Sequence, residues 1–392
     1  MIIRPKVRGF ICTTAHPAGC AAEVARQAAH CRGLEIAGEA PRAALVVGAS
    51  MGYGLSSRVA AAFGAGAATV GVIFDKPASD KRTASAGWYN TAAFHRLAAE
   101  QGLYARSVNG DAFSDEVKRE TIEVVRRDLG QVDLFVYSIG APRRTFADGT
   151  VAKSVLKPIG QPYRNKTIDV ESGTVSEVSI EPATPEEVAE TVRVMGGEDW
   201  EEWVRALREA GVLAPGATTV AYSYIGPELT FPVYRRGSIG AAKDHLEATA
   251  RRLDAELRAG GGRALVSVNK GVVTQSSSAI PVVPLYISLL FDVMKGKGLH
   301  EGTAEQMGRL VAERLYTGGE VPVDEDGRIR LDDWEMREDV QAEVARRWRE
   351  VSSENVAELA DLEGYRRDFL LLFGFGAPGV DYAADVDPHV GL

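Results

Sequence analysis

The chain has 392 residues, 45% of them hydrophobic and 25% charged, which is enough for one large globular domain with a substantial extension. Its formal net charge of −9 disfavours a role in nucleic-acid binding, which requires a basic surface. Cys12, Cys20 and Cys31 match no common zinc spacing, and their odd number argues against a disulfide framework. We therefore expect free thiols, a cytoplasmic location without a signal peptide, and no metal site.

The first functional motif follows residues 43–47, an uninterrupted apolar run typical of a strand buried on both faces of a parallel sheet. The run leads into Gly48, Gly52 and Gly54 and then into an expected helix that reaches about residue 64. Glycines at such a turn let the backbone approach a pyrophosphate, which binds free N–H groups at the helix N-terminus. A plain strand–turn–helix without a ligand is the alternative.

The second strand is expected at residues 68–75 and ends in an acidic residue. Asp75 lies 21 positions after Gly54, where a carboxylate can accept a hydrogen bond from the 2′-hydroxyl of the adenine ribose. Its charge would repel a 2′-phosphate and so favours NADH over NADPH, although Lys76 weakens that exclusion. Phe74 could pack near the adenine. The alternative for Asp75 is a helix cap or a turn residue.

A third strand is expected at residues 103–108 and a fourth from residue 132, with a helix at 115–129 between them. The alternation of strands and helices through residue 142 predicts a doubly wound parallel sheet, an α/β fold of the Rossmann type. Residues directly after these two strands could reach the adenine edge and the nicotinamide ribose, respectively. They are Asp111 and Ala112, then Ile139 and Gly140.

Residues 143–216 break this pattern and are expected to form an insertion on the substrate side. Two runs of alternating polarity, 166–170 and 174–180, are separated by a Ser-Gly turn and predict a β-hairpin. Two helices are expected after the hairpin, at 185–195 and 200–210.

The strand pattern then resumes, with a fifth strand at 220–225 and a sixth at 263–269. We therefore expect one enlarged Rossmann-type domain over residues 1–392, in which 1–142 and 217–278 form the dinucleotide-binding core. The hydroxyl-rich loop after the sixth strand would lie over the cofactor. Its candidate contacts are Val272, Val273 and Thr274.

The most apolar stretch, residues 279–294, is too short for a bilayer span and contains two prolines. We expect it to cover the pocket and to face an acyl chain, with further helices up to residue 392. A hydrophobic core helix is the first alternative, and peripheral contact with a membrane is the second.

The residues expected to carry chemistry are Tyr234 and Lys243. Nine positions apart on one helix, they would lie on opposite faces and roughly 13 Å apart along the axis. They can meet only if Tyr234 lies on a loop, and Pro232 and Gly237 supply that break. Ser238 can then cap a helix that runs to residue 257.

A phenol beside an ammonium is a proton donor, because the positive charge favours the phenolate and lowers the pKa of the phenol. Tyr234 is therefore expected to overhang a site that Lys243 enters from the first helical turns. Tyr222 and Tyr224 alternate onto one face of the fifth strand, so one of them could also line the pocket.

These motifs together resemble the trans-2-enoyl-CoA reductases and the type V enoyl-acyl-carrier-protein reductases, which are enlarged relatives of the short-chain dehydrogenases. Ordinary short-chain dehydrogenases have three residues between the tyrosine and the lysine, whereas eight separate Tyr234 from Lys243. The resemblance covers residues 1 to 390. Further segments that carry it are Gly48–Gly54, Arg82–Asn90, Met195–Trp200, Val272–Gln275 and Gly379–Tyr382.

The resemblance implies a monomeric, NADH-dependent oxidoreductase that saturates the 2,3 double bond of an enoyl thioester in fatty acid synthesis. It implies that Tyr234 is the proton donor, that Lys243 binds the nicotinamide ribose and that Tyr224 contacts the substrate. The cofactor contacts that it implies are Gly48, Ala49, Ser50, Met51, Gly52, Tyr53, Phe74, Asp75, Asp111, Ala112, Ile139, Gly140, Lys243, Val272, Val273 and Thr274.

Two other functions use the same scaffold. A carbonyl reductase or alcohol dehydrogenase would use the same tyrosine on a C=O group, and a non-enzymatic NAD-binding sensor would need no proton donor. The sequence leaves open whether CoA or acyl carrier protein carries the thioester, and which chain length is preferred.

Overall fold

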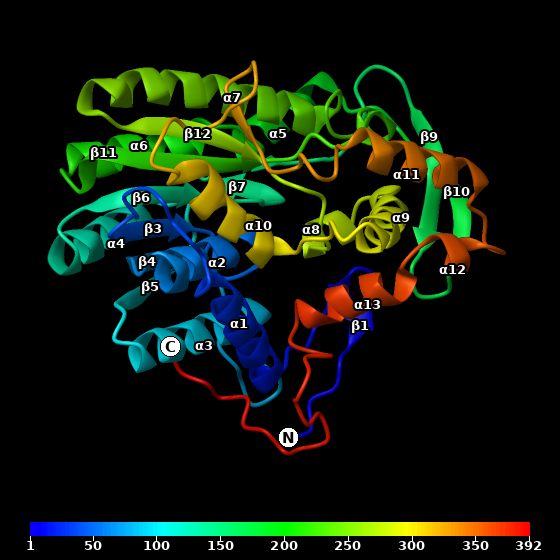
Figure 1. Ribbon diagram of the computed structural model, residues 1–392, viewed down its shortest axis with the longest axis horizontal. Coiled ribbons are helices and arrows are strands. Elements are labelled where there is room, and N and C mark those ends of the chain that lie inside the picture. The colour runs from blue at the N-terminus through cyan, green and yellow to red at the C-terminus, as the bar shows by residue number, and fades with distance from the viewer.

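Seven parallel strands form the central sheet of the computed structural model, which describes all residues from 1 to 392 (Figure 1). Their order is β13-β12-β11-β6-β3-β4-β5. The chain runs outward from β3 to β5, returns to β6 beside β3, and then runs outward in the other direction. This confirms the predicted doubly wound parallel sheet, with its switch point between β3 and β6. The strands are β3 (Ala43–Val47), β4 (Ala68–Ile73), β5 (Ala105–Asn109), β6 (Val132–Tyr137), β11 (Leu213–Ser223), β12 (Arg263–Val268) and β13 (Arg328–Arg330).

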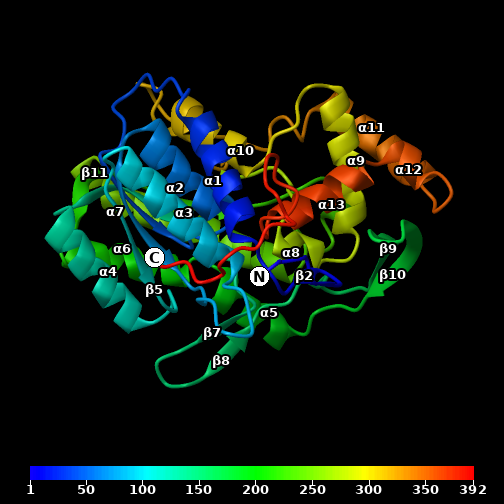
Figure 2. The ribbon, with the colours of Figure 1, turned by 90° about the horizontal axis from the view of Figure 1, so that it is seen from below.

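Helices cover both faces of this sheet because its strands are apolar on both faces. In β3, Ala44 and Val46 belong to one buried cluster, and Leu45 and Val47 belong to another. Figures 1 and 2 show helices from the two sets on opposite sides of the strands. The first set is α1 (Pro17–Cys31), α2 (Gly52–Val59), α3 (Ala86–Glu100) and α10 (Thr303–Arg309); the second is α4 (Asp115–Asp128), α6 (Glu198–Glu209) and α7 (Ser238–Leu257).

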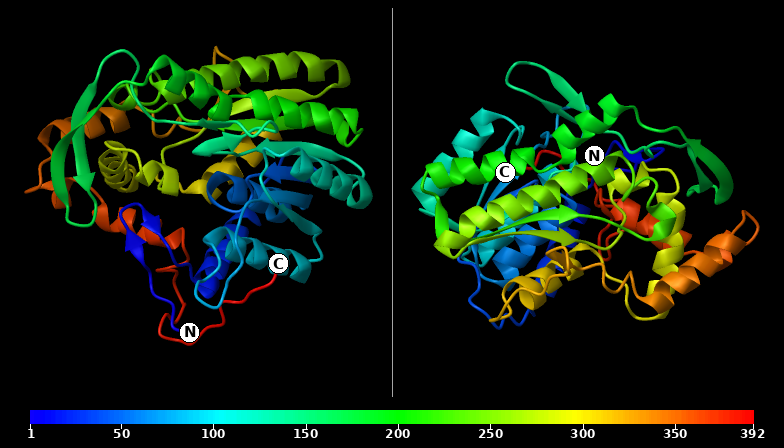
Figure 3. Two further views of the ribbon diagram at one scale, coloured as in Figure 1. Left: turned by 180° about the vertical axis from the view of Figure 1, so that it is seen from behind. Right: turned by 90° about the horizontal axis from the view of Figure 1, so that it is seen from above.

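The segment between β6 and β11 contains the predicted hairpin and helices. Strand β9 (Tyr163–Asp169) pairs antiparallel with β10 (Thr174–Ile180) at one end of the molecule (Figure 3). A second, shorter hairpin, β7 (Arg143–Thr145) with β8 (Val151–Lys153), was not predicted. Helix α5 (Pro185–Met195) begins at a capping box formed by Thr184 and Glu187. Helix α6 then returns to the sheet, where Trp200 and Trp203 are fully buried.

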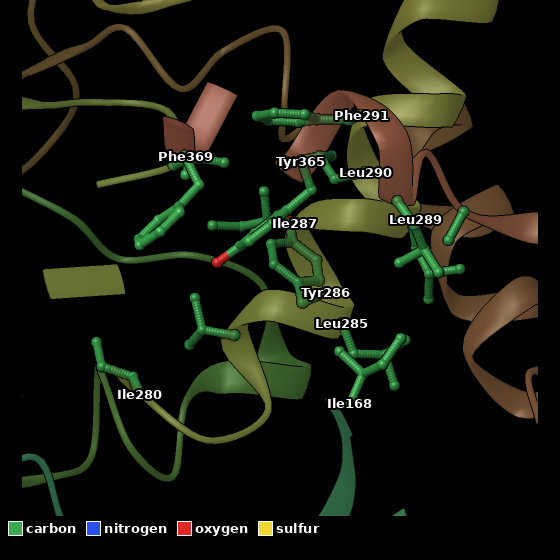
Figure 4. Close-up of a cluster of buried hydrophobic side chains, with 14 of the residues drawn as sticks. Ile168, Ile280, Leu285, Tyr286, Ile287, Leu289, Leu290, Phe291, Tyr365 and Phe369 are labelled. Atoms are coloured by element: carbon green, nitrogen blue, oxygen red, sulfur yellow. The ribbon is translucent and has the colours of Figure 1, made fainter. Parts of the chain in front are cut away.

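The C-terminal part packs around α9 (Val283–Gly296). Leu285, Tyr286, Leu289 and Leu290 on this helix have no exposed surface, and Figure 4 shows α9 side chains packed against Tyr365 and Phe369. Helix α9 is thus a core helix, the first alternative, and it has no open apolar face for a lipid surface. No helix in the structure combines the length and apolar character needed to span a bilayer. Around α9 lie α8 (Gln275–Ser278), α11 (Glu338–Glu350), α12 (Val356–Leu359) and α13 (Leu362–Leu371).

Strand β13 was not predicted either, because the chain after residue 294 was expected to be helical. It is only three residues long, and two of them are arginines. Its backbone pairs with β12 and extends the sheet, so the C-terminal part contributes a strand to the core. The N-terminal β1 (Val7–Arg8) and β2 (Ile11–Cys12) form a separate small hairpin, and the three cysteines are buried free thiols.

Candidate active site

The glycine loop between β3 and α2 is closely packed at the switch point of the sheet. Gly48 has φ of +83°, and a Cβ atom there would lie 2.1 Å from the carbonyl oxygen of Ser138, which follows β6. A Cβ atom on Gly54 would lie 1.9 Å from the carbonyl oxygen of Gly48. Helix α2 begins at Gly52 without a side-chain cap, so its first N–H groups are available to an anion. This cradle fits the pyrophosphate of a dinucleotide.

Substitution of Gly54 by alanine is expected to weaken NADH binding by about tenfold or more, because the added Cβ displaces the loop that approaches the pyrophosphate. Titration of protein fluorescence with NADH measures the effect. Gly260→Ala is the matched control, since no atom lies within 4 Å of a Cβ there. Equal NADH affinities in the two variants would contradict this role for Gly54.

Asp75 follows β4, and only one of its two carboxylate oxygens accepts a hydrogen bond within the protein. Its Oδ1 accepts a hydrogen bond from Ser85 Oγ at 2.8 Å, whereas Oδ2 is buried without a partner. A buried acceptor without a donor fits a ribose hydroxyl. The preceding Phe74 is 77% exposed, as expected for a ring that packs on an adenine. The helix-cap alternative is wrong, because α3 begins eleven residues later, at Ala86, with Ser85 as its N-cap.

The other predicted cofactor residues follow the carboxyl ends of β5, β6 and β12. Asp111 Oδ1 accepts from the backbone N–H of Phe113 at 3.0 Å and so shapes its own turn. Ile139 and Gly140 follow β6 beside the Gly48 loop. Val272 and Val273 are buried, and Thr274 accepts from Ser277 N as the N-cap of α8. All these segments therefore lie at one edge of the sheet.

Tyr234 lies on the turn before α7, as the proposed break in the chain requires. Its ring contacts that of Tyr224 edge-on, with centroids 4.8 Å apart and planes at 79°. A Cβ atom on Gly240 would lie 2.4 Å from the carbonyl oxygen of Tyr234, so this glycine allows the turn to pack closely on α7. The Tyr234 hydroxyl forms no hydrogen bond within the protein.

The electrostatics of the pair differ from the prediction. Burial raises the pKa of the Tyr234 phenol, and the charge of Glu335 raises it further. Burial also lowers the pKa of Lys243 to about 8. The predicted lowering of the phenol pKa by the ammonium is wrong, because Lys243 Nζ instead donates to the carbonyl oxygen of Tyr222 at 3.0 Å. Tyr234 is consequently a neutral phenol near pH 7 that can donate its hydrogen.

The structure also shows how Ser238, Tyr222 and Tyr224 are placed. Ser238 does not cap α7: the helix begins at Ser238 itself, and the Ser238 hydroxyl donates to the carbonyl oxygen of Val155 at 2.5 Å. Of the two alternating tyrosines, Tyr222 lies 2.5 Å from Ser57 Oγ through its hydroxyl, whereas Tyr224 is the neighbour of Tyr234.

Glu335 is the site residue that the sequence analysis missed. It has no exposed surface, and its carboxylate accepts hydrogen bonds from Tyr224 and Tyr286. The segment after β13 contains several acidic residues, and nothing in the pattern distinguishes Glu335 from its neighbours. The parallel pairing of β13 with β12 is what brings it to the site.

Three family models match successive parts of the chain. The "NAD(P)H binding domain of trans-2-enoyl-CoA reductase" matches residues 2–80, and the "Trans-2-enoyl-CoA reductase catalytic region" matches residues 82–316. The "Enoyl reductase FAD binding domain" matches residues 323–386. The first two models together cover the glycine loop, Asp75, Tyr234 and Lys243.

The residues of the third matched segment do not fit a flavin. A dinucleotide loop needs glycines after a strand, whereas β13 is followed by Asp332, Asp333 and Glu335, which would repel a pyrophosphate. The apolar side chains of α11 and α13 are used in packing the core around α9. We therefore assign no chemical step to a flavin.

Two relatives are similar to this chain along its whole length. Enoyl-[acyl-carrier-protein] reductase [NADH] from Opitutus terrae is 57% identical, over 100% of this chain and 99% of that protein. The protein of the same name from Flavobacterium johnsoniae is 59% identical, with the same coverage.

A solved structure agrees with these relatives. The crystal structure of Treponema denticola trans-2-enoyl-CoA reductase in complex with NAD is 50% identical, covers 100% of both chains and superimposes with a TM-score of 0.95. Together with the site geometry, these similarities show that this chain belongs to the trans-2-enoyl-CoA reductase family, which includes the NADH-dependent enoyl-acyl-carrier-protein reductases.

Proposed function

We propose that this protein reduces the 2,3 double bond of a trans-2-enoyl thioester with NADH, with Tyr234 as the proton donor. The observation that supports this proposal most directly is the Tyr234 hydroxyl, which is uncommitted within the protein and belongs to a turn beside the carboxyl edge of a dinucleotide-binding sheet. Its hydrogen is available to the oxygen of a bound thioester.

Tyr234 acts on the charge that develops in the substrate. When bound, the nicotinamide supplies a hydride to the β-carbon of the enoyl group. Negative charge then builds on the thioester oxygen as an enolate, and the hydrogen bond donated by Tyr234 strengthens with it. Tyr234 then supplies the proton that the enolate takes up at the α-carbon, and water returns a proton to the phenol, which completes the saturated thioester. Because its pKa is raised, Tyr234 remains protonated near neutral pH until the enolate forms.

Different residues would hold the different parts of the cofactor. The Gly48–Gly54 loop and the start of α2 would hold the pyrophosphate, Asp75 and Phe74 the adenosine, and Lys243 the hydroxyls of the nicotinamide ribose. Residues that would lie beside the rest of the cofactor are Asp111, Ala112, Ile139, Gly140, Val272, Val273 and Thr274. Tyr224 would contact the substrate next to Tyr234.

Replacing Asp75 by asparagine is expected to lower the preference for NADH over NADPH by about tenfold, because the amide no longer repels a 2′-phosphate. The measurement is the ratio of kcat/KM values for the two cofactors. The substitution keeps the shape of the side chain, so the protein should fold normally. An unchanged ratio would show that this carboxylate does not select the cofactor.

Steady-state kinetics with defined substrates tests the function. NADH should be oxidised in the presence of crotonyl-CoA, dodecenoyl-CoA or an enoyl-acyl-carrier-protein, and not with acetoacetyl-CoA or simple ketones. Activity only with ketones would support the carbonyl reductase alternative. NADH binding without turnover of any of these substrates would support the sensor. The relative rates with the two carriers identify the preferred thioester.

We propose a cytoplasmic monomer in which residues 1–142 and 217–278 bind the cofactor, 143–216 lie on the substrate side and 279–392 complete the pocket. Light scattering should then give a mass close to the 42.1 kDa of one chain.

A further inference from the structure

Three neighbouring strands of the sheet end around one buried carboxylate. Tyr224 follows β11, Gly271 follows β12 and Glu335 follows β13, and these strands are adjacent and parallel. Their carboxyl ends therefore converge at one place. Tyr286 reaches the same place from α9, in the core shown in Figure 4.

Three donors surround the Glu335 carboxylate. Its Oε1 accepts from the Tyr286 hydroxyl at 2.6 Å and from the Tyr224 hydroxyl at 3.1 Å, and its Oε2 accepts from Gly271 N at 2.7 Å. Lys270 is also buried nearby, where its amine donates to the carbonyl oxygen of Gly271 at 2.9 Å. A carboxylate that meets only donors is suited to the ionised form, which accepts and does not donate.

The hydrogen bond from Tyr224 limits what that tyrosine can do in the reaction. A hydroxyl has one hydrogen, and that of Tyr224 is given to Glu335. Tyr224 can therefore offer lone pairs to the site but no hydrogen. Its ring meanwhile packs edge-on against Tyr234, whose hydrogen is uncommitted. The two neighbouring phenols thus have different roles, and the difference originates at residue 335.

We propose that Glu335 is a positioning residue for enoyl reduction: by holding the Tyr224 hydroxyl, it fixes the Tyr224 ring against Tyr234 and leaves Tyr234 as the only phenol that donates to the substrate. This role rests on the proposed function. Glu335 touches neither substrate nor cofactor in it and acts only through Tyr224. Tyr286 binds the same carboxylate oxygen from the core and provides a natural comparison.

The variant Glu335→Gln tests this role with little change in shape. Gly271 N can only donate, so the amide oxygen should stay at the Oε2 position and the amide nitrogen should take the Oε1 position, where its hydrogens turn the Tyr224 hydrogen away from residue 335. We expect kcat with crotonyl-CoA to fall by about tenfold or more, with the Kd for NADH within about twofold of the wild-type value. In a Tyr224→Phe background, Glu335→Gln should lower kcat by less than about twofold, because the group through which it acts is gone.

Tyr286→Phe is the matched control. It removes the 2.6 Å hydrogen bond to the same carboxylate oxygen, but on the core side, so kcat should stay within about twofold. If Tyr286→Phe lowers kcat as much as Glu335→Gln, the carboxylate serves only to stabilise the core and the proposal is wrong. Equal effects of Glu335→Gln with and without the Tyr224 hydroxyl would also overturn it.

Gly271→Ala provides a second variant if Glu335→Gln does not fold. Its φ is not in the left-handed region, and the added Cβ would lie 3.3 Å from the Tyr224 hydroxyl oxygen and 3.6 Å from both carboxylate oxygens. It should lower kcat in the wild-type background and much less beside Tyr224→Phe; equal loss in both would reject the proposal. A wild-type protein that does not reduce crotonyl-CoA would instead reject the proposed function itself.

Discussion

Replacement of Tyr234 by phenylalanine is expected to lower kcat by at least about 100-fold and to leave the affinity for NADH nearly unchanged. The ring and its edge-on contact with Tyr224 remain, and only the hydroxyl is lost. That hydroxyl has no hydrogen bond within the protein, so its removal should not destabilise the fold. The loss in kcat therefore measures what the hydroxyl contributes as hydrogen-bond and proton donor, apart from the packing of the ring. Steady-state kinetics with crotonyl-CoA and a fluorescence titration with NADH provide the two numbers.

Tyr104→Phe is a suitable comparison for this substitution. Its hydroxyl donates to Asp128 at the end of α4, far from the carboxyl edge of the sheet, so this variant should keep its kcat. Normal turnover by the Tyr234 variant would show that another group delivers the proton. Loss of NADH binding together with activity would instead indicate that Tyr234 holds the cofactor site together.

The dinucleotide-binding half of the fold could be predicted because its signals are local. Strand β3 is an unbroken apolar run, and Gly48 and Gly54 are required where chain segments approach within contact distance of a Cβ. The placement of Tyr234 on a turn followed equally from the sequence, because Pro232 and Gly237 interrupt the helix pattern.

The parts that could not be predicted depend on contacts between distant segments. Strand β13 exists because its backbone pairs with β12, and Arg328–Arg330 is too short, with a single apolar residue, to predict a strand by itself. Glu335 reaches Tyr224 only through that pairing, 111 positions along the chain. The sequence predicted that the charge of Lys243 would lower the pKa of Tyr234. In the structure, burial and the distant Glu335 carboxylate raise that pKa instead.

Helix α9 shows a different limit. An apolar segment with two prolines is compatible with a pocket cover and with a core helix, because both bury apolar side chains. The packing partners decide between them, and these come from β9, α11 and α13. The local pattern does not show that these elements pack against α9. The same uncertainty explains why the hydrogen-bonding role of Tyr286 was not foreseen.

Replacement of Lys243 by methionine is expected to lower kcat/KM for NADH by about 100-fold, because the variant loses the ammonium that would hold the nicotinamide ribose. The pH dependence makes this test specific. Burial lowers the pKa of Lys243 to about 8, and kcat/KM reports ionisations of the free enzyme. In the wild type, kcat/KM for NADH should therefore decrease as the pH rises through about 8. The methionine variant should lack this decrease.

A control is needed for Lys270, because burial lowers the pKa of this lysine to about 8 as well. In Lys270→Met the decrease in kcat/KM should persist if Lys243 is the titrating group. Its disappearance there, and its persistence in Lys243→Met, would reverse the assignment.

Stability should change in the opposite sense to activity. The pKa of Lys243 is below its ordinary value of 10.5 in the folded state, so between about pH 8 and 10.5 the unfolded chain binds more protons. Stability from this group is therefore lowest below pH 8, where the buried amine is charged, and it rises toward pH 10.5. Lys243→Met removes the charge and should have a Tm at pH 7 no lower than that of the wild type, with a smaller rise at alkaline pH. A protein that loses activity while keeping its Tm would show that Lys243 is retained for the reaction and not for the fold.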